Sequence, residues 1–226
     1  NLLYVGCMPS YITKDVAAST YLVLKKLGFE FMLLKDEGCC GLYLYEAGRP
    51  DLAEKIFRKN VERFKSLGIR RIITPCCGCL ECFKYLYPKL LGEIDFSVHH
   101  VVEVLYDLLK ENPKVLSKIP RNITYQDSCR LARKEGLTEE PREILRWCGA
   151  ELVEMEENRK EVLCCGAGGG VRSVYKDLSE EMAARLLRMS PARTLVSACP
   201  FCTFNLGRVS KKRGMEKSVV YFTSLV

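Results

Sequence analysis

The chain has 226 residues, of which 48% are apolar and 28% charged, the balance of a globular protein long enough to bury a sizeable core. Its 35 basic and 28 acidic residues give a net charge of +7, but the basic residues form no stripe with interleaved aromatics, so we expect no nucleic-acid partner. No stretch reaches the roughly 18 uninterrupted apolar residues of a membrane helix and no export leader is recognisable, so we expect no membrane span and no secretion.

Strand-like and helix-like spacings of apolar residues alternate along the chain. In the first part, strands are predicted at 2–5, 29–34, 71–74 and 96–98, and helices at 15–27, 51–67, 80–91 and 100–110. In the second part, strands are predicted at 122–126, 152–155, 194–197 and 219–222, and helices at 141–147, 176–189 and up to about 212.

Residues 112–121 contain two prolines, which is typical of a linker. They divide the chain into a first repeat, 1–111, and a second repeat, 122–226. Alternating strands and helices are typical of α/β proteins with mainly parallel sheets. The predicted fold class is therefore α/β, with two tandem, pseudo-symmetric, Rossmann-like repeats.

Thirteen cysteines are the most informative feature of the composition. Disulfide frameworks usually belong to short secreted domains with poor cores, whereas this chain has good core patterning, so metal binding in a reducing compartment is favoured. The triplet Cys39-Cys40-Gly41 recurs 125 residues later as Cys164-Cys165-Gly166. Each copy has a lone cysteine upstream and a Cys-x-x-Cys downstream. The chain therefore contains an internal duplication.

Every group of these cysteines follows a predicted strand. Ligands of parallel α/β sheets collect at the carboxyl ends of the strands, so we expect the five cysteines of each repeat to converge there. The first set is Cys7, Cys39, Cys40, Cys76 and Cys79, and the second set is Cys129, Cys164, Cys165, Cys199 and Cys202.

The number of cysteines in each set bears on the metal. A structural zinc ion takes four ligands, and an ordinary cubane iron–sulfur cluster also takes four cysteines. Five thiols are one too many for either, whereas a thiolate that bridges two irons would use the surplus. The residues alone favour an unusual iron–sulfur site in each repeat, and a zinc-stabilised interaction scaffold is the weaker alternative.

The two Cys-Cys-Gly triplets with their flanking cysteines resemble the CCG cysteine-rich domain, over essentially the whole chain. That family includes the catalytic subunits of heterodisulfide reductases, of the B and D types, and the iron–sulfur subunits of glycolate, lactate and glycerol-3-phosphate oxidases. Four segments resemble the D-type subunit in particular: Tyr125 to Cys129, Val153 to Met155, Cys164 to Val171 and Ala198 to Cys202.

The resemblance implies two non-cubane [4Fe-4S] clusters, one for each set of five cysteines. It implies a heterodisulfide-reductase-like oxidoreductase acting on sulfur groups, which interconverts a disulfide and two thiols in a two-electron step. The alternative is an electron-transfer subunit that passes electrons from a flavin-dependent oxidase toward quinone. The residues predicted to be catalytic are Cys39, Cys40, Cys164, Cys165 and His100.

The resemblance also implies partners: a small-molecule disulfide or thiol substrate, and other redox subunits such as a ferredoxin-like domain, a flavoprotein or a membrane cytochrome subunit. The implied location is the cytoplasm, including its membrane face where a partner holds the subunit there. D-type subunits usually carry an N-terminal ferredoxin-like domain. Because this chain begins at Asn1 and not at Met, we expect a partial product that such a domain precedes.

Some residues depart from the family pattern or fall outside the two sets. Gln126 and Arg130 stand where many relatives have histidine, which puts a role of those imidazoles in doubt here. The three remaining cysteines are predicted as a non-ligand beside Cys76 and two buried packing residues, which are Cys77, Cys82 and Cys148 respectively. Three arginines near the motifs are predicted either as solvated or as contacts of an anionic substrate: Arg130, Arg133 and Arg172.

Overall fold

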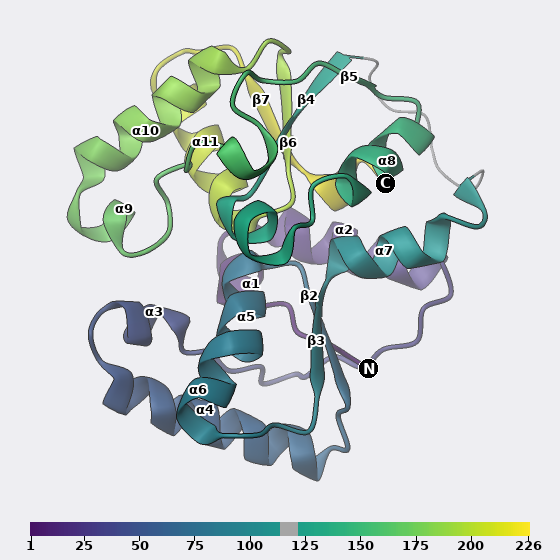
Figure 1. Ribbon diagram of the computed structural model, residues 1–226, viewed down its shortest axis with the longest axis vertical. Coiled ribbons are helices and arrows are strands. Elements are labelled where there is room, and N and C mark those ends of the chain that lie inside the picture. Colours follow the sequence, from purple (N-terminus) through teal and green to yellow (C-terminus); the bar gives the residue numbers. More distant parts are fainter. Residues whose placement is uncertain (114–121) are drawn as a thin grey trace.

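The computed structural model describes residues 1–113 and 122–226, and it contains two parallel β-sheets (Figure 1). The strands are Leu2–Leu3 (β1), Arg71–Thr74 (β2), Ser97–His100 (β3), Asn122–Gln126 (β4), Glu151–Leu152 (β5), Thr194–Ser197 (β6) and Ser218–Tyr221 (β7). The first sheet has the order β1-β2-β3 and the second the order β5-β4-β6-β7, and each described strand is parallel to its neighbours. The predicted α/β class with parallel sheets is confirmed.

The central strands are apolar because both faces of a parallel sheet are covered. Ile72 and Ile73 of β2 are fully buried, as are Leu195 and Val196 of β6. Figure 1 shows the sheet of the second repeat between two layers, with helices α10 (Lys176–Met189) and α11 (Pro200–Lys212) on one side and α8 (Glu140–Trp147) on the other.

The helices of the first repeat follow the predicted pattern closely. The longest, Pro50–Ser66 (α4), begins with proline in its first turn, where no backbone hydrogen bond is lost, and Gly68 follows its end. The predicted helix at 80–91 is a continuous run of two α-helices with a π-helical turn between them. The first repeat comprises Cys7–Tyr11 (α1), Lys14–Lys26 (α2), Leu42–Glu46 (α3), α4, Cys77–Glu81 (α5), the π-helical turn Cys82–Leu86, Tyr87–Leu91 (α6) and Val101–Leu109 (α7).

The second repeat adds several short elements to α8, α10 and α11. They are the π-helical turn Leu131–Glu135, the 3₁₀ turns Arg159–Glu161 and Phe222–Ser224, and the one-turn helix Val171–Val174 (α9). Among the described helices, none combines the length and the apolar character that a membrane crossing requires.

Two sequence-based expectations differ from the structure. The strand predicted at 29–34 is reduced to a single bridge between Leu2 and Met32, because that segment has only β1 beside it and leaves Met32 and Leu33 largely exposed. The one-turn helices α1, α3 and α9 were not predicted, because so few residues establish no helical period. The boundary at 112–121 stays a prediction, because residues 114–121 lie outside the described part of the chain.

The two repeats pack into one body with a common hydrophobic core. Between α7 and α8, the rings of Tyr106 and Trp147 stack with centroids 5.5 Å apart. Near the end of the chain, the hydroxyl of Thr223 lies 2.7 Å from that of Ser19 in α2. The hydroxyl of Tyr221 donates to the Pro75 carbonyl over 2.7 Å, next to the first Cys-x-x-Cys. These contacts hold the cysteine-bearing ends of the repeats against each other.

Candidate metal centre

All ten cysteines of the two predicted sets line one cavity of about 330 Å³ between the repeats. Residues from α3 and α9, the short helices that follow the two Cys-Cys-Gly triplets, line it as well, and Figure 1 shows these helices on the same side of the molecule. The convergence follows from the topology, because parallel strands bring the loops that follow them to one end of each sheet.

The thiols of the first set form a continuous chain of contacts, in the order Cys7, Cys39, Cys40, Cys79 and Cys76. The chain begins with two exposed cysteines and ends with three buried ones. Hydrogen bonding from Cys39 lowers the pKa of both Cys7 and Cys40, whereas contact with Cys40 raises the pKa of Cys79. Thiols with lowered and raised pKa therefore alternate along the set.

The second set repeats this order as Cys129, Cys164, Cys165, Cys202 and Cys199. Its first two cysteines are half-buried and the other three are buried. Hydrogen bonding from Cys129, followed by that from Cys165, lowers the pKa of Cys164 to about 2. The contact of Cys202 likewise lowers the pKa of Cys199 well below the usual range. The duplication seen in the sequence is thus present in space, thiol by thiol.

The glycine of each triplet has a backbone that an L side chain rarely adopts. Gly41 has φ of 89° and Gly166 has φ of 78°. A Cβ would lie 2.7 Å from the Phe57 ring at the first position and 2.9 Å from the Ser179 carbonyl oxygen at the second. The amide of Gly41 also donates to the Cys39 sulfur at 3.3 Å, and that of Gly166 to Cys164 at 3.4 Å. Glycine therefore permits the close packing of each triplet.

Buried asparagines hold the Cys-Cys peptides in place. The Asn60 side chain donates to the Cys39 carbonyl at 2.9 Å, and the Asn205 side chain donates to the Cys165 carbonyl at 2.8 Å. Sequence reasoning missed both residues. The available signal was an asparagine within the apolar face of a helix, where a polar side chain stays buried only with hydrogen-bond partners.

The loops before the lone cysteines are held by carboxylates. Glu37 accepts hydrogen bonds from the amides of Val5 and Gly6 at 2.8 and 2.6 Å, and burial raises its pKa to about 7. In the second repeat, Asp127 precedes Cys129 and binds the guanidinium of Arg142 through both carboxylate oxygens, at 2.8 and 2.7 Å.

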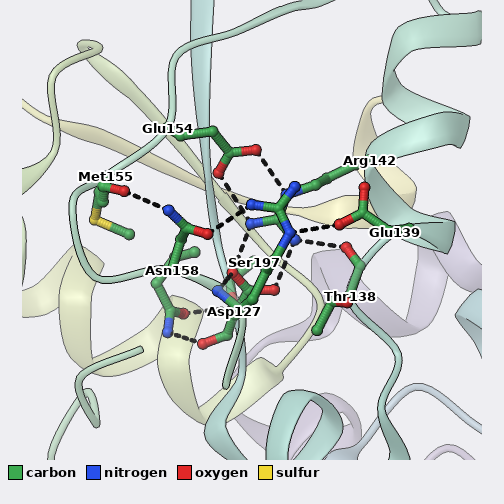
Figure 2. Close-up of polar contacts among 10 residues, drawn as sticks. Asp127, Thr138, Glu139, Arg142, Glu154, Met155, Asn158 and Ser197 are labelled. Atoms are coloured by element: carbon green, nitrogen blue, oxygen red, sulfur yellow. Dashed lines mark hydrogen bonds and ion pairs between the residues drawn. The ribbon is translucent and has the colours of Figure 1, made fainter. Parts of the chain in front are cut away.

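Figure 2 shows Arg142 at the centre of this polar cluster. Besides Asp127 it contacts Glu154, at 2.7 and 2.9 Å, and the Thr138 carbonyl at 2.5 Å. The Arg142 and Asp127 side chains are fully buried. Asp127 also accepts from the amide of Arg159 at 2.7 Å, which ties the Cys129 loop to the segment that leads to Cys164. Sequence reasoning missed Arg142, because an arginine on an amphipathic helix is typical of a solvated face.

The remaining cavity wall is mainly apolar, with two arginines. Arg130 forms ion pairs with Glu46 and Glu81. The Arg172 guanidinium lies 4.6 Å from the centre of the Phe204 ring, and its buried Nε has no hydrogen-bond partner among the described residues. Arg133 instead donates to the carbonyls of Lys160 and Val162 and does not line the cavity. Arg172 is thus a cavity cation that no described carboxylate neutralises.

His100 lies outside the cavity lining. It is fully buried at the start of α7, where its Nδ1 accepts from the Val102 amide at 3.3 Å, and burial lowers its pKa to about 4. Its predicted catalytic role stays a prediction. Gln126, at the end of β4, accepts from the Ser197 hydroxyl at 2.9 Å.

The three cysteines outside the two sets are buried and do not line the cavity. Cys82 donates to the Cys40 carbonyl at 3.2 Å, and burial raises the pKa of Cys148 to about 11. Cys77 contacts the opposite repeat through Cys199.

The donors in the cavity fit an iron–sulfur group. Soft thiolates select metals such as zinc, copper(I) and the irons of iron–sulfur clusters. Within residues 1–113 and 122–226, no His, Cys, Asp and Glu side chains are grouped in the manner of a single-ion site. The thiols are instead spread around a cavity larger than one ion.

The chain belongs to the cysteine-rich domain (CCG) family, whose model matches residues 2–84 and 123–207. The two matches coincide with the two five-cysteine sets.

The D-type subunit of dihydromethanophenazine:CoB–CoM heterodisulfide reductase from Methanosarcina acetivorans is 38% identical over 96% of this chain and 56% of its own length. The B-type subunit of fumarate reductase (CoM/CoB) from Methanothermobacter marburgensis is 31% identical over 94% of this chain and 42% of its own length. EtfAB:quinone oxidoreductase from Syntrophomonas wolfei is 31% identical over 98% of this chain and 33% of its own length. The chain thus spans about half of the heterodisulfide reductase relative and less of the other two.

Among solved structures, glutamate racemase isoform RacE1 from Bacillus anthracis matches 100% of this chain and 78% of its own, at 12% identity and a TM-score of 0.43. So low a score has no bearing on function.

Proposed function

We propose that the chain is the iron–sulfur subunit of a heterodisulfide-reductase-like oxidoreductase, with two non-cubane [4Fe-4S] clusters. The observation that carries the proposal is the arrangement of ten thiols around one cavity, in the same order of contacts in both repeats. The family match and the 38% identity to a heterodisulfide reductase relative support it.

The two sets of thiols would hold one cluster each. When bound, the clusters supply the two electrons that reductive cleavage of one sulfur–sulfur bond requires. Metal binding needs deprotonated thiols, and neighbouring thiols in each set already lower the pKa of several members. In this proposal Cys39, Cys40, Cys164 and Cys165 bound the space where the substrate sulfurs react.

The chain itself would bind and orient the substrate. The disulfide takes up two electrons and two protons and leaves as two thiols. The cavity lies between the two sets, so one small disulfide can meet both, while apolar residues such as Leu42 and Phe204 exclude water. The unneutralised guanidinium of Arg172 favours a substrate with a sulfonate, phosphate or carboxylate arm. His100 remains a predicted proton donor, at a distance from the cavity lining.

Turnover by the anaerobically purified holoprotein tests the proposal, with a reduced viologen dye as electron source and mixed disulfides as substrates. We expect thiol release that is abolished in Cys39→Ala and Cys164→Ala and retained in Cys148→Ala, whose thiol lies away from the cavity. Iron-loaded protein that reduces no disulfide would contradict the proposal, as would undiminished turnover in Cys164→Ala.

The second candidate is an electron-transfer subunit. It is favoured by the 31% identity to EtfAB:quinone oxidoreductase over 98% of this chain. In that case the same thiols would hold redox centres that only pass electrons between partner subunits. Co-purification with a flavoprotein, together with clusters that a quinone analogue oxidises and no disulfide turnover, would distinguish this function from the first.

The partners follow from either candidate. Relatives named as subunits support a redox complex, in which a ferredoxin-like domain, a flavoprotein or a membrane cytochrome subunit delivers or accepts electrons. A cytoplasmic location, including attachment to the membrane through such a partner, remains part of this proposal.

A further inference from the structure

An eleventh thiol lies where the Cys-x-x-Cys turns of the two repeats meet. Cys77 directly follows Cys76, begins α5 and is fully buried. It does not line the cavity that the two five-cysteine sets surround. Its position in the sequence assigns it to the first repeat, but its side chain reaches the second.

The contacts of Cys77 are mostly with the second repeat. Its Sγ donates to the Ala198 carbonyl at 3.4 Å. The thiol is also in hydrogen-bonding contact with Cys199 and Ser128. From its own repeat, His100 brings Nε2 to 3.9 Å from the sulfur. A member of the first Cys-x-x-Cys turn therefore contacts a thiol of the second set.

This contact has no equivalent in the opposite direction among the described residues. Cys76 corresponds to Cys199 in the duplication, so the residue that corresponds to Cys77 is Pro200, which has no polar side chain. The second repeat returns a different contact, because Tyr221 donates to the backbone carbonyl of Pro75 and not to a thiol. The two sets of thiols are alike, but their polar surroundings are not.

We propose that Cys77 is a positioning residue for the second centre, where its S–H group hydrogen-bonds the Cys199 sulfur and makes that centre easier to reduce. The inference rests on the proposed function, because it takes the Cys199 sulfur to be a cluster ligand. Reduction places more negative charge on a cluster and its thiolates, and a donor to a ligand sulfur stabilises that charge. Burial strengthens the effect, because no water competes for the sulfur.

The test compares the reduction midpoints of the two centres in anaerobically purified holoproteins, followed by electron paramagnetic resonance during a redox titration. The variants are Cys77→Ala, Cys77→Ser and, as a matched buried thiol away from both sets, Cys148→Ala. Cys77→Val repeats the alanine experiment with the buried volume filled, in case alanine destabilises the chain. Iron is counted in every preparation before titration.

We expect all variants to carry as much iron as the original protein. In Cys77→Ala and Cys77→Val, one midpoint moves to a more negative potential and the other does not move. Cys77→Ser, which keeps a donor, shifts the midpoint less, and Cys148→Ala shifts neither.

Three results would overturn the inference: unmoved midpoints in the alanine and valine variants, equal shifts of both midpoints, or iron loss in all three Cys77 variants, which would make Cys77 a ligand. An original protein without iron would instead contradict the proposed function.

Discussion

The two repeats place equivalent thiols in equivalent positions, but they stabilise the loops around those thiols differently. In the first repeat, one carboxylate, Glu37, accepts two backbone amides before Cys7. In the second, Asp127 before Cys129 belongs to a buried ion-pair cluster centred on Arg142. The Cys-Cys peptides are supported alike, by Asn60 and Asn205. After duplication the donor geometry has been kept, while the electrostatic support has diverged.

The largest difference between the repeats is expected from Arg142→Leu. Removing the arginine leaves the buried Asp127 carboxylate without its ion-pair partner, which costs about 3–5 kcal/mol of unfolding free energy. Because Asp127 supports the Cys129 loop, we expect the variant to keep the iron of the first centre and lose that of the second. Urea unfolding and iron analysis measure both effects.

The exposed pair of Arg58 with Glu54 provides the control for that variant. Arg58→Leu is expected to change the unfolding free energy by less than about 1 kcal/mol. Similar losses from both variants, or equal loss of iron from both centres in Arg142→Leu, would contradict the division between the repeats.

The corresponding test in the first repeat is Glu37→Ala. Without the carboxylate, the amides of Val5 and Gly6 lose their acceptors, which costs about 2–3 kcal/mol for two partly buried donors. The iron of the first centre is expected to fall, the reverse of the Arg142 result. Glu37→Gln, which keeps an acceptor oxygen, should lose less. If both centres responded equally to Glu37→Ala, the two supports would not be independent.

A pH effect is expected at the seam between the repeats. The pKa of His100 is lowered to about 4, first by burial, so the unfolded chain binds more protons than the folded one between pH 6.5 and 4. The stability that neutral His100 contributes is therefore complete above pH 6.5 and is lost as the pH falls.

Between pH 7 and pH 5 the expected loss from His100 is about 2 kcal/mol. His100→Asn keeps an acceptor for the start of α7 but does not titrate there. The difference in urea unfolding free energy between the original protein and this variant, measured at both pH values, should change by that amount. An unchanged difference would show that His100 is not held neutral by burial.

The smallest effect is expected where the repeats are alike. Asn60→Ala and Asn205→Ala each remove a side-chain donor from a carbonyl of the Cys-Cys peptide. Each should cost about 1 kcal/mol, and the two costs should agree within the error of the unfolding measurement. A loss confined to one variant would show that the Cys-Cys peptides, like the preceding loops, are supported differently.

The convergence of the cysteines could be predicted, whereas their supports could not. Each group of thiols follows a strand, and parallel strands end at one edge, so the sequence pattern was sufficient. The helices at 51–67 and 176–189 have enough turns to show a period, and the structure has them at Pro50–Ser66 and Lys176–Met189. Nothing in the local sequence distinguishes Arg142 from a surface arginine, because its partners Asp127 and Glu154 lie on other elements.

The central claim is that ten thiols form two equivalent iron–sulfur sites, and the metal content of the anaerobically purified protein tests it most directly. Two [4Fe-4S] clusters predict about eight irons and eight acid-labile sulfides per chain. Cys40→Ala and Cys165→Ala, which alter one set each, should each reduce that content by about half. Stoichiometric zinc without iron, or complete iron binding in both variants, would contradict the account.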